Sequence, residues 1–126
     1  MAGRRSKNKG KRGEREVATL FREALSDLGL DVRRGWQSRN GGSDEPDVIV
    51  PEELALHVEV KRHKRCNARA ALKQAIADAK PGLTPVAFCR DDADGKVADR
   101  MPPFVVLRQE DFVDMVVEWF KLKQGG

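Results

Sequence analysis

The chain has 126 residues, of which 40% are apolar and 35% are charged. This length and composition are typical of one globular domain and exclude a disordered or fibrous chain. No apolar run approaches the roughly 20 residues that a membrane helix needs. No apolar segment follows the basic N-terminus either, so we expect neither a signal peptide nor a membrane anchor. Two cysteines are too few for a disulfide framework, which favours a cytoplasmic location.

Positive charge is distributed unevenly along the chain. Lys and Arg number 24 against 20 Asp and Glu, a net charge of +4, and the basic residues gather in three clusters. Segregated positive charge is typical of proteins that bind nucleic acid, because neutralising phosphates releases condensed counterions. A solubilising tail with ordinary surface charge is the alternative. The basic residues expected to contact nucleic acid are Arg4, Arg5, Lys7, Lys9, Lys11, Arg12, Arg15, Arg34, Arg39, Arg62, Lys64 and Arg65.

In chain order, residues 1–10 are predicted to form a disordered basic arm, and residues 11–126 a single domain. From Gly13 on, apolar residues recur at helical spacing, which predicts an amphipathic helix that ends at Gly29. Its apolar stripe consists of Val17, Leu20, Phe21, Ala24, Leu25 and Leu28. Three strands are predicted to follow, and they span residues 31–36, 47–50 and 54–62.

Asn67 is predicted to cap a second helix that runs to about Ala79. Two further strands and a last helix are predicted over residues 84–90, 104–107 and 109–122. The resulting order, α-β-β-β-α-β-β-α, predicts an α/β fold (mixed α+β) with a central mixed β-sheet of about five strands flanked by helices. The last helix is apolar on more than one stripe, which exceeds what one contact with a sheet needs. We therefore expect a homodimer.

Three positions carry charged side chains that an ordinary core does not require. Glu14 lies on the apolar stripe of the first helix, where a carboxylate is costly to desolvate unless a cation meets it; a place at the rim is the alternative. Asp47 opens an apolar strand, from whose end it can project, or it is a turn residue after Pro46. Glu59 and Lys61 share one face of a clearly alternating strand, where an exposed ion pair is the alternative.

Two adjacent strands joined by a short loop would bring Asp47 and Glu59 close enough to share one divalent cation, with Lys61 beside it. Mg²⁺ prefers oxygen ligands and is usually held by one or two carboxylates together with substrate phosphate. A cation lowers the pKa of bound water, and a neighbouring ammonium stabilises negative charge on the reacting phosphate. These three residues therefore predict phosphodiester hydrolysis.

Pro46-Asp47, followed after eleven residues by Glu59-Val60-Lys61, resembles the motif of the PD-(D/E)xK nuclease superfamily. Lys9-Gly10 and Glu14-Arg15 ahead of the helix stripe, with Ser38 in a Gly-containing loop, resemble the archaeal-type Holliday junction resolvases, a branch also found in phages. The resemblance spans roughly residues 9–90. It implies a restriction-endonuclease-like core and a nuclease domain over residues 11–126.

The resemblance also implies which residues form the active site and what they act on. Its active-site residues would be Glu14, Asp47, Glu59 and Lys61, joined by Ser38 and by Gln74 on the second helix. Asp47, Glu59 and Glu14 would hold Mg²⁺, for which Mn²⁺ would substitute. The implied activity is a Mg²⁺-dependent, structure-selective endonuclease of DNA recombination and repair that cuts near the branch point of a Holliday junction. Its partner would be branched or double-stranded DNA, in the cytoplasm of a bacterial, archaeal or phage-infected cell.

Two other functions remain open from the sequence. The first keeps the same chemistry in another PD-(D/E)xK nuclease that is nicking, restriction-like or active in repair. The second is a non-catalytic basic DNA-binding protein in which Asp47, Glu59 and Lys61 form a structural ion cluster. The absence of an extra recognition domain in so short a chain favours readout of DNA shape over readout of base sequence.

Overall fold

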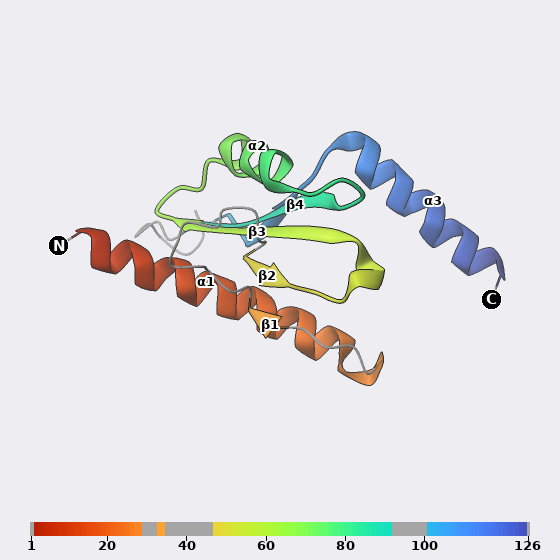
Figure 1. Ribbon diagram of the computed structural model, residues 1–126, viewed down its shortest axis with the longest axis horizontal. Coiled ribbons are helices and arrows are strands. Elements are labelled where there is room, and N and C mark those ends of the chain that lie inside the picture. The colour runs from red at the N-terminus through yellow and green to blue at the C-terminus, as the bar shows by residue number, and fades with distance from the viewer. Residues whose placement is uncertain (1, 29–32, 35–46, 92–100, 126) are drawn as a thin grey trace.

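The computed structural model describes residues 2–28, 33–34, 47–91 and 101–125. Helices and strands are mixed along the chain (Figure 1), so the predicted mixed α/β class is confirmed. The elements are α1 (Ala2–Leu25), the 3-10 turn η1 (Ser26–Leu28), β1 (Arg33–Arg34), β2 (Val48–Ile49), the 3-10 turn η2 (Glu52–Leu54), β3 (Leu56–His63), α2 (Ala68–Asp78), β4 (Thr84–Asp91), β5 (Phe104–Val106) and α3 (Gln109–Gly125).

The strands form one sheet in the order β1-β2-β3-β4-β5. Its centre is the parallel pair of β3 and β4, which are eight residues long each. A parallel pair needs a crossover connection, and α2 supplies it. The side chain of Asn67 accepts a hydrogen bond from the Ala70 amide at 3.1 Å, so the predicted helix cap is confirmed. The short strands β1, β2 and β5 pair antiparallel with their neighbours.

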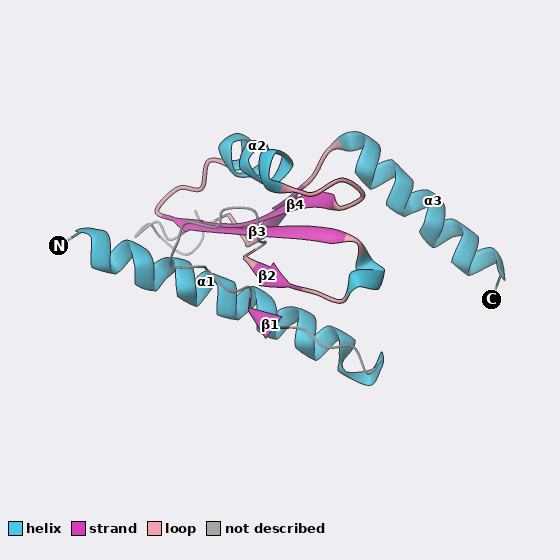
Figure 2. Cartoon of the chain, viewed as in Figure 1, coloured by secondary structure: helices cyan, strands magenta, loops and turns pink. Residues whose placement is uncertain are grey.

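The helices α1 and α2 cover opposite faces of this sheet (Figure 2) because β3 and β4 alternate in what they bury. Val58 and Val60 of β3 pack with Ala18 of α1 in one buried cluster. On the other face, Ala87 of β4 packs with Ala71 of α2 in a second cluster. Side chains at odd positions of β3 therefore lie on the face that α2 covers.

Gly13 sets how closely α1 approaches β3. A Cβ atom at this position would lie 3.2 Å from Cγ1 of Val60 and 3.3 Å from Cβ of Arg62. Such contacts are tighter than ordinary packing, so a residue without a side chain is favoured here although glycine weakens a helix by about 1 kcal/mol. The close approach brings the next residue, Glu14, down onto the sheet.

The first helix differs from the expectation at both ends. It includes residues 2–10, where a disordered arm was expected; Lys and Arg favour helix once the segment from Gly13 on is packed. Toward its C-terminal end, Ala24 is exposed, Leu20 is 59% exposed, and Leu28 is 67% exposed in η1. The strands β1 and β2 are only two residues long. The side chains of α1 that do pack on the buried cluster of Val58 and Val60 are those of Val17, Phe21 and Leu25.

The last helix, α3, extends from β5 away from the sheet (Figure 1), and every residue from Phe112 to Gly125 is exposed. The exposed side chains include Phe112, Val113, Met115, Val116, Val117, Trp119, Phe120 and Leu122. Among the described helices, none is long and apolar enough to cross a membrane.

Candidate active site

Asp47 is held at the point where β2 begins to pair with β3. Its amide donates to the carbonyl oxygen of Val58 at 2.9 Å, and its Oδ2 accepts from the amide of Val60 at 2.8 Å. A side-chain oxygen thus takes the role that a strand carbonyl would otherwise have for Val60. The carboxyl group is thereby fixed against the middle of β3, beside Glu59.

Glu59 on β3 and Glu14 on α1 both lie close enough to Asp47 for their charges to act on it. Glu14 is 5% exposed and Glu59 is 2% exposed, so the structure places Glu14 inside, as its position on the apolar stripe predicted, and not at the rim. Burial raises the pKa of Asp47 to about 7, together with the negative charge of Glu59. A hydrogen bond with Glu59 and the charge of Glu14 raise this pKa further, whereas the bond from the Val60 amide lowers it.

This group of carboxyls has the chemistry of a site for a hard cation. Negative charges that are close together and poorly hydrated repel each other, and a divalent cation would relieve the repulsion. Within the described part of the chain, no three His, Cys, Asp or Glu side chains are arranged as a ready-made metal cage. Mg²⁺ does not need one, because it keeps several waters and takes one or two carboxylates plus phosphate. The donor set of Asp47 and Glu59 therefore fits Mg²⁺.

Lys61 follows Glu59 by two residues on β3, so both side chains lie on the same face of the sheet. Lys61 is part-exposed, whereas Glu59 is buried. Lys61 therefore lies on the face of the sheet that carries Glu59, at a position that solvent reaches.

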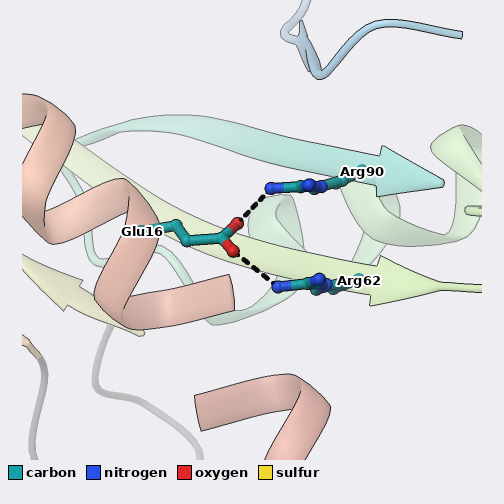
Figure 3. A network of polar contacts seen from close by, with 3 residues as sticks. All are labelled: Glu16, Arg62 and Arg90. Atoms are coloured by element: carbon teal, nitrogen blue, oxygen red, sulfur yellow. Dashed lines mark hydrogen bonds and ion pairs between the residues drawn. The ribbon is translucent and has the colours of Figure 1, made fainter. Parts of the chain in front are cut away.

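Glu16 ties α1 to the sheet by a contact that sequence reasoning missed (Figure 3). Its carboxylate accepts hydrogen bonds from Arg62 on β3 and Arg90 on β4, each at 2.6 Å. The three residues are far apart in sequence, and helical periodicity placed Glu16 on the solvated side of α1. The network holds the segment that carries Glu14 against β3 and β4.

The expected nucleic-acid contacts fall into three groups. Arg62 is engaged with Glu16, and its side chain is only 10% exposed, which leaves it little surface for a phosphate. Five of the expected residues are exposed, on α1 or just after β3, and these are Lys11, Arg12, Arg15, Lys64 and Arg65. Figure 1 shows the N-terminal half of α1 and the carboxyl end of β3 at the same end of the molecule. The segments that carry Lys11, Arg12, Lys64 and Arg65 therefore lie at one end of the molecule, which is called the basic end below.

The remaining candidates cannot be placed in the same way. Arg4, Arg5, Lys7 and Lys9 belong to α1 and Arg34 to β1, but their side chains are outside the described part, as are Ser38 and Arg39 altogether. Gln74 is exposed on α2, whose buried side is formed by Ala71 and Ala75. Because Gln74 directly precedes the buried Ala75, its side chain leaves α2 on a different side from the one that packs on the sheet. Among the described residues, no hydrogen bond joins Gln74 to the carboxyl cluster.

Comparisons of the chain with protein-family models, with curated proteins and with solved structures found no match. Its function is therefore inferred from its own residues: the buried Glu14 and Glu59 that act on Asp47, a lysine on the same strand as Glu59, and a basic end of the molecule.

Proposed function

We propose that the protein is a Mg²⁺-dependent DNA endonuclease of the PD-(D/E)xK type with a restriction-endonuclease-like core, and that it resolves Holliday junctions. The observation that carries the proposal is the burial of Glu14 and Glu59 beside Asp47, whose pKa is raised to about 7 by burial and by their charges. Carboxyls that are this close and this buried repel each other, and a divalent cation would relieve the repulsion.

Asp47 and Glu59 would hold the cation, and Glu14 would bind it directly or through water. Bound Mg²⁺ supplies positive charge that lowers the pKa of water and offsets the charge of the phosphate. Mn²⁺ would substitute, because it accepts the same carboxylate and water ligands.

Lys61 would act on the phosphate itself. In the reaction a water oxygen forms a bond to phosphorus while the bond from phosphorus to a deoxyribose oxygen breaks, and negative charge builds on the phosphoryl oxygens. An ammonium group on the same face as Glu59 stabilises that charge in the transition state. Removing Lys61 should therefore slow cleavage more than it weakens DNA binding.

DNA would be held by the basic end of the molecule. Exposed residues such as Lys11, Arg12, Lys64 and Arg65 would contact phosphates, which position a duplex without reading its bases. Contacts of this kind suit selection by shape, as a four-way junction requires. Two opposed strands must be cut in a junction, and a two-fold dimer would present two sites. We propose that a second copy of the chain covers the exposed apolar side chains of α3.

A cleavage panel tests the proposal. Labelled four-way junction, flap and linear duplex DNA are incubated with the protein in Mg²⁺, in Mn²⁺ or in EDTA. Wild type should cut the junction near its branch point with either metal but not in EDTA. Asp47→Ala, Glu59→Ala and Lys61→Ala should lower the rate by at least a hundredfold while binding persists. Glu53→Ala, which removes an exposed carboxylate, is the charge-matched control and should cut normally.

Each other outcome of the panel points to a different function. Equal cutting of all three DNAs would leave a nuclease of another kind and remove the resolvase. Binding without cleavage in every metal lane would support a non-catalytic DNA-binding protein, with the carboxyl cluster as a structural feature.

A further inference from the structure

We propose that His57 is a positioning residue, which holds Oε1 of Glu59 and so fixes the direction in which this carboxylate meets the cation. The inference rests on the proposed function, since it assigns Glu59 to the metal. His57 itself would touch neither metal nor DNA.

The contact is short and closed off from solvent. Nε2 of His57 lies 2.9 Å from Oε1 of Glu59, and the two residues are 0% and 2% exposed. They are two positions apart on β3, so they share the face that α2 covers. β3 pairs with strands on both sides, which holds the backbone of both residues in place.

The direction of this hydrogen bond follows from the chemistry of the two groups. An ionised carboxylate only accepts, so Nε2 of His57 carries the proton and donates. The other ring nitrogen, Nδ1, is buried, and no partner for it is found among the described residues. A buried polar atom without a partner is destabilising. An apolar side chain would avoid that cost, so what favours histidine here is the bond to Glu59.

The consequence for Glu59 is a restricted carboxylate. Oε1 is held by His57, while the carboxyl group also meets Asp47, with which it shares a hydrogen bond. A ligand held in this way loses little freedom when it binds a cation, and partners behind metal ligands typically contribute 10–100-fold in metal affinity.

Mn²⁺ binding in the absence of DNA tests the inference directly. The full chain is titrated with Mn²⁺, and the free ion is followed by electron paramagnetic resonance. His57→Leu should raise the Kd for Mn²⁺ about tenfold, whereas His57→Gln, which keeps a donor, should stay closer to wild type. His63→Leu, an exposed histidine on the same strand, is the matched control and should leave the Kd unchanged.

Cleavage kinetics should separate positioning from chemistry. For His57→Leu, the Mg²⁺ concentration at half-maximal rate should rise about tenfold, while the rate at saturating Mg²⁺ should fall only a few-fold.

Long-range ¹H–¹⁵N spectra of the wild type should show a proton of His57 on Nε2. This measurement uses the wild type alone and so does not depend on whether a variant folds.

The possible failures are distinguishable. If wild type binds Mn²⁺ and His57→Leu binds it equally well, or if the proton lies on Nδ1, the positioning role is wrong while the nuclease proposal stands. If wild type binds no Mn²⁺ and cuts no DNA in Mg²⁺, the proposed function fails and the inference fails with it.

Discussion

Asp47 is the residue whose environment departs most clearly from that of an ordinary surface carboxyl. Its pKa is raised to about 7 by burial and by the charges of Glu59 and Glu14, whereas an unfolded Asp titrates near 3.9. A folded-state pKa above the unfolded one stabilises the fold at low pH. That stability is fully present below the unfolded value and is lost as the pH rises through about 7.

The predicted result is a stability that depends on pH and on the cation. In EDTA at pH 8, Asp47→Asn should unfold several degrees above wild type, because it removes the repelled charge; near pH 4 the difference should vanish. Added Mg²⁺ at pH 8 should raise the melting temperature of wild type but not of the variant. Thermal unfolding followed by circular dichroism measures both effects. Asp27→Asn, at an exposed site, should behave as wild type, and a variant less stable than wild type at pH 8 would contradict the prediction.

The sequence predicted the place of some residues of the candidate site but not all contacts between them. It brought Asp47 and Glu59 together because alternation and a short connection fix which strands are neighbours. It placed Glu14 inside because helical periodicity assigns that position to the apolar stripe. Periodicity cannot show which side chain of a buried face bonds to which, so the bond from His57 to Glu59 emerged only from the structure.

At the scale of elements, α1 depends on two different contacts to hold the site together. Gly13 lets the helix approach β3, and Glu16 links it to Arg62 and Arg90. The sequence indicated the helix and its inward face. It could not indicate the link, because the partners of Glu16 lie on strands 46 and 74 residues away.

Loss of the Glu16 carboxylate should therefore affect both stability and activity. Glu16→Ala removes two charged hydrogen bonds and should lower the free energy of unfolding by about 2 kcal/mol. It should also slow cleavage, because the segment that carries Glu14 is held less firmly. Urea unfolding and the cleavage assay measure the two effects. Glu23→Ala, an exposed acid on the same helix, is the control, and equal behaviour of the two variants would show that the network is unimportant.

At the scale of the whole molecule, α3 is the element whose apolar side chains the single chain leaves exposed. The sequence predicted its helix and the excess of apolar side chains, but not that all of them from Phe112 onward would be exposed. Large exposed apolar patches mark interaction surfaces. The lone chain therefore leaves uncovered the surface that we assign to a second copy.

Sedimentation equilibrium should show a dimer at micromolar concentration. Trp119→Glu, in the middle of the apolar surface, should give monomers, because it places a charge where the partner would pack. Leu28→Glu makes the same kind of change at an exposed site outside α3 and should leave the dimer intact. The monomeric variant should nick a junction in one strand in place of cutting both. A monomeric wild type would refute the dimer but not the nuclease.

One continuous helix carries both basic residues and Glu14, the carboxyl that we propose for the active site, since α1 runs from Ala2 to Leu25 with Glu14 near its middle. Each helical residue advances about 1.5 Å, so the backbone of Arg4 lies about 15 Å along the axis from Glu14. A phosphate gripped near the start of α1 would sit at a set spacing from the bond that is cut. The length of the helix would then set the distance between the bound phosphate and the cleaved bond. Adding or removing one helical turn between Arg4 and Glu14 would shift the cut along the DNA strand.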